Sequence, residues 1–218
     1  MVDSKAELQV CLAILESVRK MVAAGLVDGT SGNISARGEN IGEMIITPGS
    51  YSYEKMTIGD LVKVNVHSLE RTRGFRPPSS ESPMHAAIYR KRMDVRGIVH
   101  THSRYATAWS TLCRPIPAIH YVVSSIGNEV PVTGYHTYGS TDLAEEASGL
   151  LETHNATLLQ NHGVIAVGAS LADALKNAVR VEFLAQELLL TQGLGAHILT
   201  THDLDLVREQ GMKKRLAH

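Results

Sequence analysis

The stretch GIVHTHSRYA, residues 97–106, places two histidines at the end of an apolar run. Ile98 and Val99 favour a buried strand. Because side chains alternate along a strand, His100 and His102 point to the same face of it. Two imidazoles on one face can share a metal ion at about 2.1 Å each. They can equally end a strand by bonding to backbone and water, so the pair alone leaves both interpretations open.

A third histidine lies in a second apolar segment, ATLLQNHGVIAVG, residues 156–168. This segment is typical of two strands joined by a turn, and His162 stands in the turn, directly before Gly163. Glycine at that point allows a positive φ or a close backbone approach. Three histidines that leave one position open have the composition of a catalytic zinc site. Spacing alone does not establish that His162 meets the other two.

A carboxylate that could serve such a site is found in PPSSE, residues 77–81. Ser79, Ser80 and Glu81 lie where a loop enters a helix, and free N–H groups and hydroxyls at a helix start bind phosphate. Glu81 could act as a base beside a metal. The alternative is a serine N-cap with an acidic first turn, worth about 1 kcal/mol of helix stability. TSGNIS, residues 30–35, is similarly either a phosphate-binding loop or a turn.

The composition restricts the class of protein. The 218 residues predict one domain, residues 1–218, with 44% hydrophobic and 20% charged residues. A net charge of −1 gives no electrostatic case for binding nucleic acid or an anionic membrane. Two cysteines make no disulfide framework, so we expect a reducing, cytoplasmic location. No apolar run approaches the ~20 residues that span a bilayer.

Hydrophobic periodicity predicts alternating helices and strands. Helices are expected over residues 5–24, 82–92, 103–113, 140–151, 170–192 and 203–215. Strands are expected over residues 44–50, 61–67, 97–102 and 130–135 and in two runs within 156–168. Residues 69–80 form a polar, proline-containing loop. This alternation by itself favours a parallel sheet.

Taken together, these motifs resemble the class II aldolase/adducin family over nearly the whole chain. The motifs are GTSGNISAR (29–37), IITPGS (45–50), YEKM (53–56), PPSSE (77–81), HTH (100–102), IPAIHY (116–121) and ATLLQNHGVIAVG (156–168). Each is weak alone, but their order and approximate spacing match the family. The resemblance implies an α/β fold with three layers, α/β/α, around a central, largely antiparallel β-sheet.

The resemblance also implies roles for individual residues. One Zn²⁺ per subunit, or another divalent metal, would be bound by His100, His102 and His162. Glu81 would be the acid/base and would also occupy the fourth position of the metal. The phosphate of the substrate would be held by Thr30, Gly32, Asn33, Gly49, Ser50, Ser79 and Ser80. Tyr121 would be catalytic in the active site of a neighbouring subunit, which implies a homotetramer with active sites at subunit interfaces.

The implied reaction is reversible cleavage of a ketose 1-phosphate, L-fuculose 1-phosphate or similar, to dihydroxyacetone phosphate and a short aldehyde such as L-lactaldehyde. The family also contains pentulose-phosphate aldolases, ribulose-5-phosphate 4-epimerases, decarboxylases and non-catalytic, adducin-like interaction domains. The epimerase carries aspartate in place of Glu81 and lacks IPAIHY, whereas an interaction domain is expected to lose the metal histidines. These differences favour an aldolase. No tyrosine follows Asp203, where the fuculose enzyme has one, so the aldehyde remains open.

Overall fold

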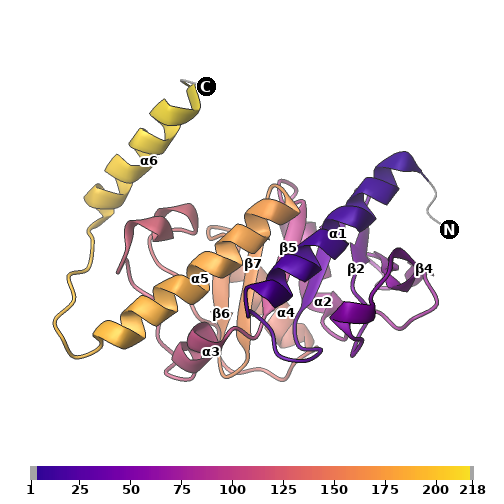
Figure 1. Ribbon diagram of the computed structural model, residues 1–218, viewed down its shortest axis with the longest axis horizontal. Coiled ribbons are helices and arrows are strands. Elements are labelled where there is room, and N and C mark those ends of the chain that lie inside the picture. Colours follow the sequence, from indigo (N-terminus) through magenta and orange to yellow (C-terminus); the bar gives the residue numbers. More distant parts are fainter. Residues whose placement is uncertain (1–3, 217–218) are drawn as a thin grey trace.

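The computed structural model describes residues 4–216 and is built around one seven-stranded sheet (Figure 1). Its strands are β1 (Asn33–Arg37), β2 (Glu43–Ile46), β3 (Val62–Asn65), β4 (Arg71–Arg73), β5 (Gly97–Thr101), β6 (Ala156–Leu159) and β7 (Gly163–Gly168). The strand order is β4-β3-β2-β1-β5-β7-β6, and every neighbouring pair is antiparallel. The largely antiparallel α/β fold is therefore confirmed.

Helices cover both faces of this sheet. They are α1 (Lys5–Ala23), α2 (Ser82–Lys91), α3 (Arg104–Ser110), α4 (Thr141–Leu150), α5 (Leu171–Thr191) and α6 (Thr201–Leu216). Short 3₁₀ turns occur at η1 (Tyr53–Lys55), η2 (Ile58–Asp60) and η3 (Tyr121–Ser125). In Figure 1, α1 and α5 cross one face of the sheet, α2 and α4 lie behind it, and α6 extends away from the body.

Alternating side chains in the central strands create two separate cores. Val99 belongs to the core under α1, α3 and α5, whereas its neighbour Ile98 belongs to the core under α2 and α4. Val164 and Ile165 divide between the same two cores. Both faces of the sheet are therefore buried, which produces the three layers.

The expectation of a parallel sheet, drawn from element alternation alone, was wrong. Tight turns join β1 to β2 and β6 to β7, and such turns connect antiparallel strands, whereas a parallel pair needs a long crossover. The predicted strand at 130–135 was also wrong as a regular strand, because only isolated bridges pair Val130 with Ile116 and Val132 with Leu158. In contrast, the polar loop 69–80 contains the short edge strand β4.

The six predicted helices are confirmed, and their first turns show why they begin where they do. Ser4, Ser140 and Ser170 are N-caps whose side chains accept hydrogen bonds from the backbone N–H three residues later. Within residues 4–216, no helix combines the length and apolarity needed to cross a bilayer.

The packing of β5 against the start of α5 yields a stability prediction. A Cβ added at Gly97 would lie 2.7 Å from both Cα and N of Leu171, which are backbone atoms that cannot turn aside. Gly97→Ala should therefore lower the free energy of unfolding by about 1–3 kcal/mol, as overpacking does. Urea unfolding at a fixed protein concentration measures this loss.

The matched control is Gly59→Ala, where the nearest atom, Thr57 Oγ1, lies 3.7 Å away in ordinary contact. Equal urea midpoints for the two variants would contradict the close packing of β5 on α5.

Candidate metal centre

Four side chains from three parts of the fold converge at one end of β5. They are Glu81, His100, His102 and His162, and their ligand atoms all lie within 4.8 Å of one another. Glu81 is the residue directly before α2, and His162 lies in the turn between β6 and β7. His100 lies in β5, and His102 directly follows the last residue of that strand. The structure thus brings His162 to the pair, which spacing alone did not establish.

The sheet positions the histidines by its register. Asn33 of β1 pairs with His100 of β5, so both lie at the same level of the sheet. At Gly163 an added Cβ would lie 2.3 Å from the carbonyl oxygen of Thr101, so glycine permits the β6–β7 turn to approach β5. The positive φ of this turn belongs instead to Asn161, at 53°.

The three imidazoles are arranged symmetrically around one point. The ring centroids of His100, His102 and His162 are 4.9 Å apart in all three pairs. Nε2 of His100 and Nε2 of His102 lie 3.0 Å apart. The other ring nitrogen of His100, Nδ1, lies 2.8 Å from the carbonyl oxygen of Val164. Since a carbonyl only accepts, Nδ1 carries a proton there, and this bond fixes how the ring is oriented.

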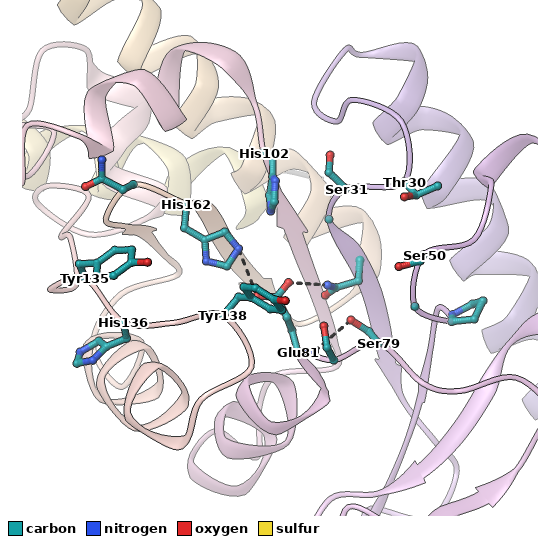
Figure 2. Close-up of a pocket in the computed structure, with 16 residues that line it drawn as sticks. Thr30, Ser31, Ser50, Ser79, Glu81, His102, Tyr135, His136, Tyr138 and His162 are labelled. Carbon is teal, nitrogen blue, oxygen red and sulfur yellow. Dashed lines mark hydrogen bonds and ion pairs between the residues drawn. The ribbon is translucent and has the colours of Figure 1, made fainter.

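Glu81 is buried and directed at the same point. One carboxylate oxygen, Oε2, lies 3.0 Å from Nε2 of His100 and accepts a 2.9 Å hydrogen bond from the Asn33 side-chain amide. The other oxygen, Oε1, lies 3.4 Å from Nε2 of His162. Figure 2 shows Glu81 reaching towards His162. The Glu81 backbone N–H donates to Ser79 Oγ at 3.2 Å, which fixes the start of α2.

Burial and mutual charge set the protonation of the cluster. Burial alone would raise the pKa of the Glu81 carboxyl, but the nearby His100 and His162 and the Asn33 amide lower it below its ordinary range. Burial lowers the pKa of His102 to about 3 and that of His162 to about 4, and His100 adds to both effects. These two rings are therefore neutral near pH 7, which is the form that binds metals.

His100 differs, because burial acts to lower its pKa but the charge of Glu81 outweighs it and the pKa is raised. The carboxylate of Glu81 therefore favours the protonated form of His100. Three donor pairs of the cluster, His100–His102, His100–Glu81 and His162–Glu81, lie 3.0–3.4 Å apart, close to the spacing of donors around a four-coordinate ion with bonds of about 2.0–2.2 Å. These residues could bind a metal ion.

A cavity of about 290 Å³ opens next to the cluster. Glu81, His102 and His162 line one part of it. Another part is lined by hydroxyl groups and glycine backbone, from Thr30, Ser31, Gly32, Asn33, Pro48, Gly49, Ser50, Ser79 and Ser80. All seven residues predicted to hold a phosphate, namely Thr30, Gly32, Asn33, Gly49, Ser50, Ser79 and Ser80, therefore lie around the cavity. Figure 2 shows Thr30, Ser50 and Ser79 on one side of it.

Gly32 shows why this loop needs glycine. Its φ is 74°, and an added Cβ would lie 2.6 Å from the backbone oxygen of His100. The loop therefore packs directly on the strand that carries two of the histidines. Tyr53 holds it there by donating to the carbonyl oxygens of Ser31 and Gly32, at 2.9 and 2.6 Å.

Tyr121 does not lie in this cavity. It is in η3, is 54% exposed, and lines a second hollow together with Arg180 and Arg208. Its ring packs on that of His120, at 4.5 Å between centroids. The tyrosine is therefore placed on the surface of this chain rather than beside its own cluster.

Sequence reasoning missed several residues that line the cavity. They are Ser31, Pro48, Tyr135, His136, Tyr138 and Asn161. Ser31, Pro48 and Asn161 lie inside motifs that were singled out, so proximity to those motifs was a usable signal. The other three lie in YHTYG, which has no periodicity and no recognisable chemistry of its own.

Comparison with known proteins agrees with this geometry. A family model described as "Class II Aldolase and Adducin N-terminal domain" matches residues 13–189. An L-fuculose phosphate aldolase from Escherichia coli O6:H1 is 38% identical over 200 residues, covering 90% of this chain and 91% of the relative. A 5-methylthioribulose-1-phosphate/5-deoxyribulose-1-phosphate aldolase from Rhodospirillum rubrum is 38% identical over 175 residues, covering 80% and 77%.

Solved structures give the same result. An L-fuculose 1-phosphate aldolase superimposes with a TM-score of 0.89 at 32% identity, covering 97% of this chain and 98% of that one. The family model spans most of the chain, and the Escherichia coli relative and this solved structure each cover at least 90% of it. This chain therefore belongs to the class II aldolase and adducin family, as an enzyme of the aldolase kind.

Proposed function

We propose that this protein is a zinc-dependent aldolase that reversibly cleaves a ketose 1-phosphate to dihydroxyacetone phosphate and a short aldehyde. The observation that carries the proposal is the juxtaposition of two kinds of site in one cavity. Three histidines and a carboxylate meet at one part of it, and hydroxyls with glycine backbone line another. A metal centre beside a phosphate site suits a metal-dependent aldol reaction on a sugar phosphate.

His100, His102 and His162 would hold the zinc ion, one per subunit, with Glu81 able to occupy a fourth position. A bound zinc ion supplies Lewis-acid stabilisation of the negative charge that develops when the carbon–carbon bond breaks. The bond from His100 Nδ1 to Val164 keeps the opposite nitrogen directed into the site.

Glu81 would move the proton of the reaction. In the synthetic direction its carboxylate takes a proton from the hydroxymethyl carbon of dihydroxyacetone phosphate, and the C–H electron pair forms the enediolate double bond. That carbon then attacks the aldehyde carbon, and the aldehyde oxygen takes up a proton as it becomes a hydroxyl. The lowered pKa of Glu81 keeps it ionised, which is the form that accepts a proton.

Asn33, Ser79, Ser80 and the loop around Gly32 and Gly49 would hold the phosphate. Hydrogen bonds to a charged group contribute about 1.5–3 kcal/mol each, so several of them make the phosphate the main anchor. Binding energy from this remote group would then position the reacting carbon against Glu81.

Tyr121 would donate the proton to the aldehyde oxygen, acting in the active site of a neighbouring subunit. Its exposure on this chain and its distance from the cavity support a role in trans. A head-to-tail contact of this kind closes a ring when its rotation allows, and we propose a homotetramer. Val179 and Phe183 on α5 are also exposed, and both could be covered by such a contact.

The substrate within this class is proposed to be L-fuculose 1-phosphate or a similar ketose 1-phosphate. One relative is named for fuculose phosphate and another for methylthioribulose and deoxyribulose phosphates. An epimerase or decarboxylase of the family remains the alternative reaction. An adducin-like interaction domain is disfavoured, since all three histidines and Glu81 are present and converge.

The first prediction of the proposed function concerns the metal. His102→Ala should lower zinc affinity by more than about 100-fold, because even outer-shell partners are worth 10–100-fold. Elemental analysis and competition with a chelator measure this. His67→Ala is the control, since His67 is exposed and lies outside the cluster. Wild-type zinc content in His102→Ala would refute the assignment.

The second prediction concerns the reaction. Wild-type protein should release dihydroxyacetone phosphate from ketose 1-phosphates but not, at comparable efficiency, from the free ketoses. Glu81→Gln should lose about 10²–10⁴-fold in rate, the usual contribution of one positioned acid/base. A coupled assay over a panel of sugars measures both. Equal turnover of free and phosphorylated sugars would contradict the phosphate site, and undiminished turnover in Glu81→Gln would contradict the base.

The third prediction concerns the shared site. Subunits carrying Glu81→Gln and subunits carrying Tyr121→Phe should regain activity when they are dissociated and reassembled together. In a random mixed ring about one site in four would combine an intact Glu81 with an intact Tyr121 from its neighbour. Native mass spectrometry establishes the mixing. Mixed rings no more active than their parents, or a fully active monomer, would rule the arrangement out.

A further inference from the structure

The ring of His102 is held less directly than that of His100. Nδ1 of His100 bonds to the carbonyl oxygen of Val164, and its Nε2 faces the Glu81 carboxylate. Among residues 4–216, the only hydrogen-bonding contact of the His102 ring is its 3.0 Å approach to Nε2 of His100. Histidines that bind metals usually have their other ring nitrogen fixed by a hydrogen bond. The position of His102 in the cluster therefore depends on its backbone.

The backbone of His102 joins β5 to α3. His102 directly follows the strand, and the next residue, Ser103, is the N-cap of the helix. Ser103 is fully buried, but its side chain makes no capping hydrogen bond, and the first turn of α3 contains no acidic residue. The serine caps of α1, α4 and α5, in contrast, accept from a backbone N–H of their own helix. The first N–H groups of α3 therefore need an acceptor from elsewhere in the chain.

That acceptor is Glu182, which lies in α5. Its Oε1 accepts a 2.9 Å hydrogen bond from the backbone N–H of Tyr105, and its Oε2 accepts a 2.9 Å bond from the backbone N–H of Ala106. Hydrogen bonds to a carboxylate are stronger than those to a neutral acceptor. α3 lies beside α5 in the fold (Figure 1). One side chain of the long helix thus takes the part that the hydroxyl of Ser103 leaves unfilled.

These two bonds fix the path of the chain as it leaves β5. Before His102, Thr101 is held in the sheet by its pairing with β7. After His102, the backbone of Tyr105 is held by Glu182. The ring of His102 also lies against the β6–β7 turn, because a Cβ added at Gly163 would lie 3.1 Å from its Cδ2. A shift of α3 relative to α5 would therefore move this ring relative to the other two histidines.

We propose that Glu182 is a positioning residue of the metal centre and that it holds His102 in place through the first turn of α3. The inference rests on the proposed metal site. Glu182 does not line the cavity and is not one of the four side chains that converge there. Its effect is therefore on the affinity for the metal ion and not on proton transfer at Glu81.

Removal of the Glu182 carboxylate tests this assignment directly. Glu182→Ala removes both acceptors and should lower zinc affinity by about 10–100-fold, the range typical of outer-shell partners of metal ligands. Glu182→Gln keeps one acceptor oxygen and should lose less. Competition with a chromogenic chelator measures the affinity, and a cooperative urea transition shows that each variant is folded.

The matched controls are Glu187→Ala and Glu187→Gln. Glu187 lies on the same helix, is half-buried, and its carboxylate makes no hydrogen bond or ion pair within the described part of the chain. Both control variants remove the same charge from α5 without touching α3. They should bind zinc with wild-type affinity.

Double variants identify the ligand through which Glu182 acts. Added to His102→Ala, Glu182→Ala should cause little further loss of zinc affinity, because the ligand that Glu182 positions is already missing. Added to His162→Ala, it should cause most of its full loss. A residue that merely stabilises the fold would instead add the same loss to both histidine variants.

Amide hydrogen exchange in the metal-free protein tests the contact itself. Exchange at Tyr105 and Ala106 should be faster in Glu182→Ala than in the wild type, and unchanged in Glu187→Ala, because only the first variant frees these two N–H groups. NMR resolves the two residues individually. Unchanged exchange at both residues in Glu182→Ala would contradict the contact on which the assignment depends.

Wild-type zinc affinity in Glu182→Ala would overturn the assignment. So would equal further losses in the two double variants, or a loss in the Glu187 controls that matches the loss in the Glu182 variants. A wild-type protein that binds no zinc contradicts the proposed metal centre and, with it, this inference. Zinc binding that the Glu182 variants leave unaltered contradicts this inference alone.

Discussion

The register between β1 and β5 is the constraint on which the site depends. It sets Asn33 opposite His100, and the Asn33 amide in turn binds the Glu81 carboxylate. A slip of one residue would turn every side chain of β5 to the opposite face and would place Val99 where His100 now stands. The two cores prevent this slip, because Ile98 and Val99 are each fully buried in a different one. Ordinary hydrophobic packing thus aligns the polar cluster.

Burial of the cluster costs solvation free energy, and contacts within the protein compensate for that loss. A carboxylate removed from water loses far more solvation than a single hydrogen bond returns. Glu81 is compensated by two imidazoles and an amide, and its backbone is fixed by Ser79. Neutral His102 and His162 then present nitrogen lone pairs beside a negative charge, an arrangement that attracts a cation. Burial raises the free-energy cost of a charged Glu81 carboxylate, and it also strengthens the electrostatic interactions of this group with its neighbours.

Much of the fold and part of the site could be predicted from residues alone. Alternation in GIVHTH correctly predicted a strand, β5, and the six predicted helices lie close to their observed ranges. Local patterns could not show whether the strands run parallel or antiparallel, because that depends on which strands pair and not on their order along the chain. The meeting of His162 with His100 followed only from the family resemblance, since no local pattern encodes a contact over 62 residues. Residues 134–139 escaped notice because their backbone is fixed by contacts with Glu146 and Ser80, which no local sequence pattern encodes.

The strand order β1-β5-β7 has a kinetic consequence. Each of these neighbours is separated by some sixty residues of chain, so the centre of the sheet is held by pairings that close large loops. Such non-local pairings form slowly, because the chain loses loop entropy before the contacts compensate for it. No fragment ending before the β6–β7 turn contains the complete set of histidines. Assembly of the site is therefore tied to completion of the sheet, and a nascent chain has no metal centre until nearly all of its strands have been made.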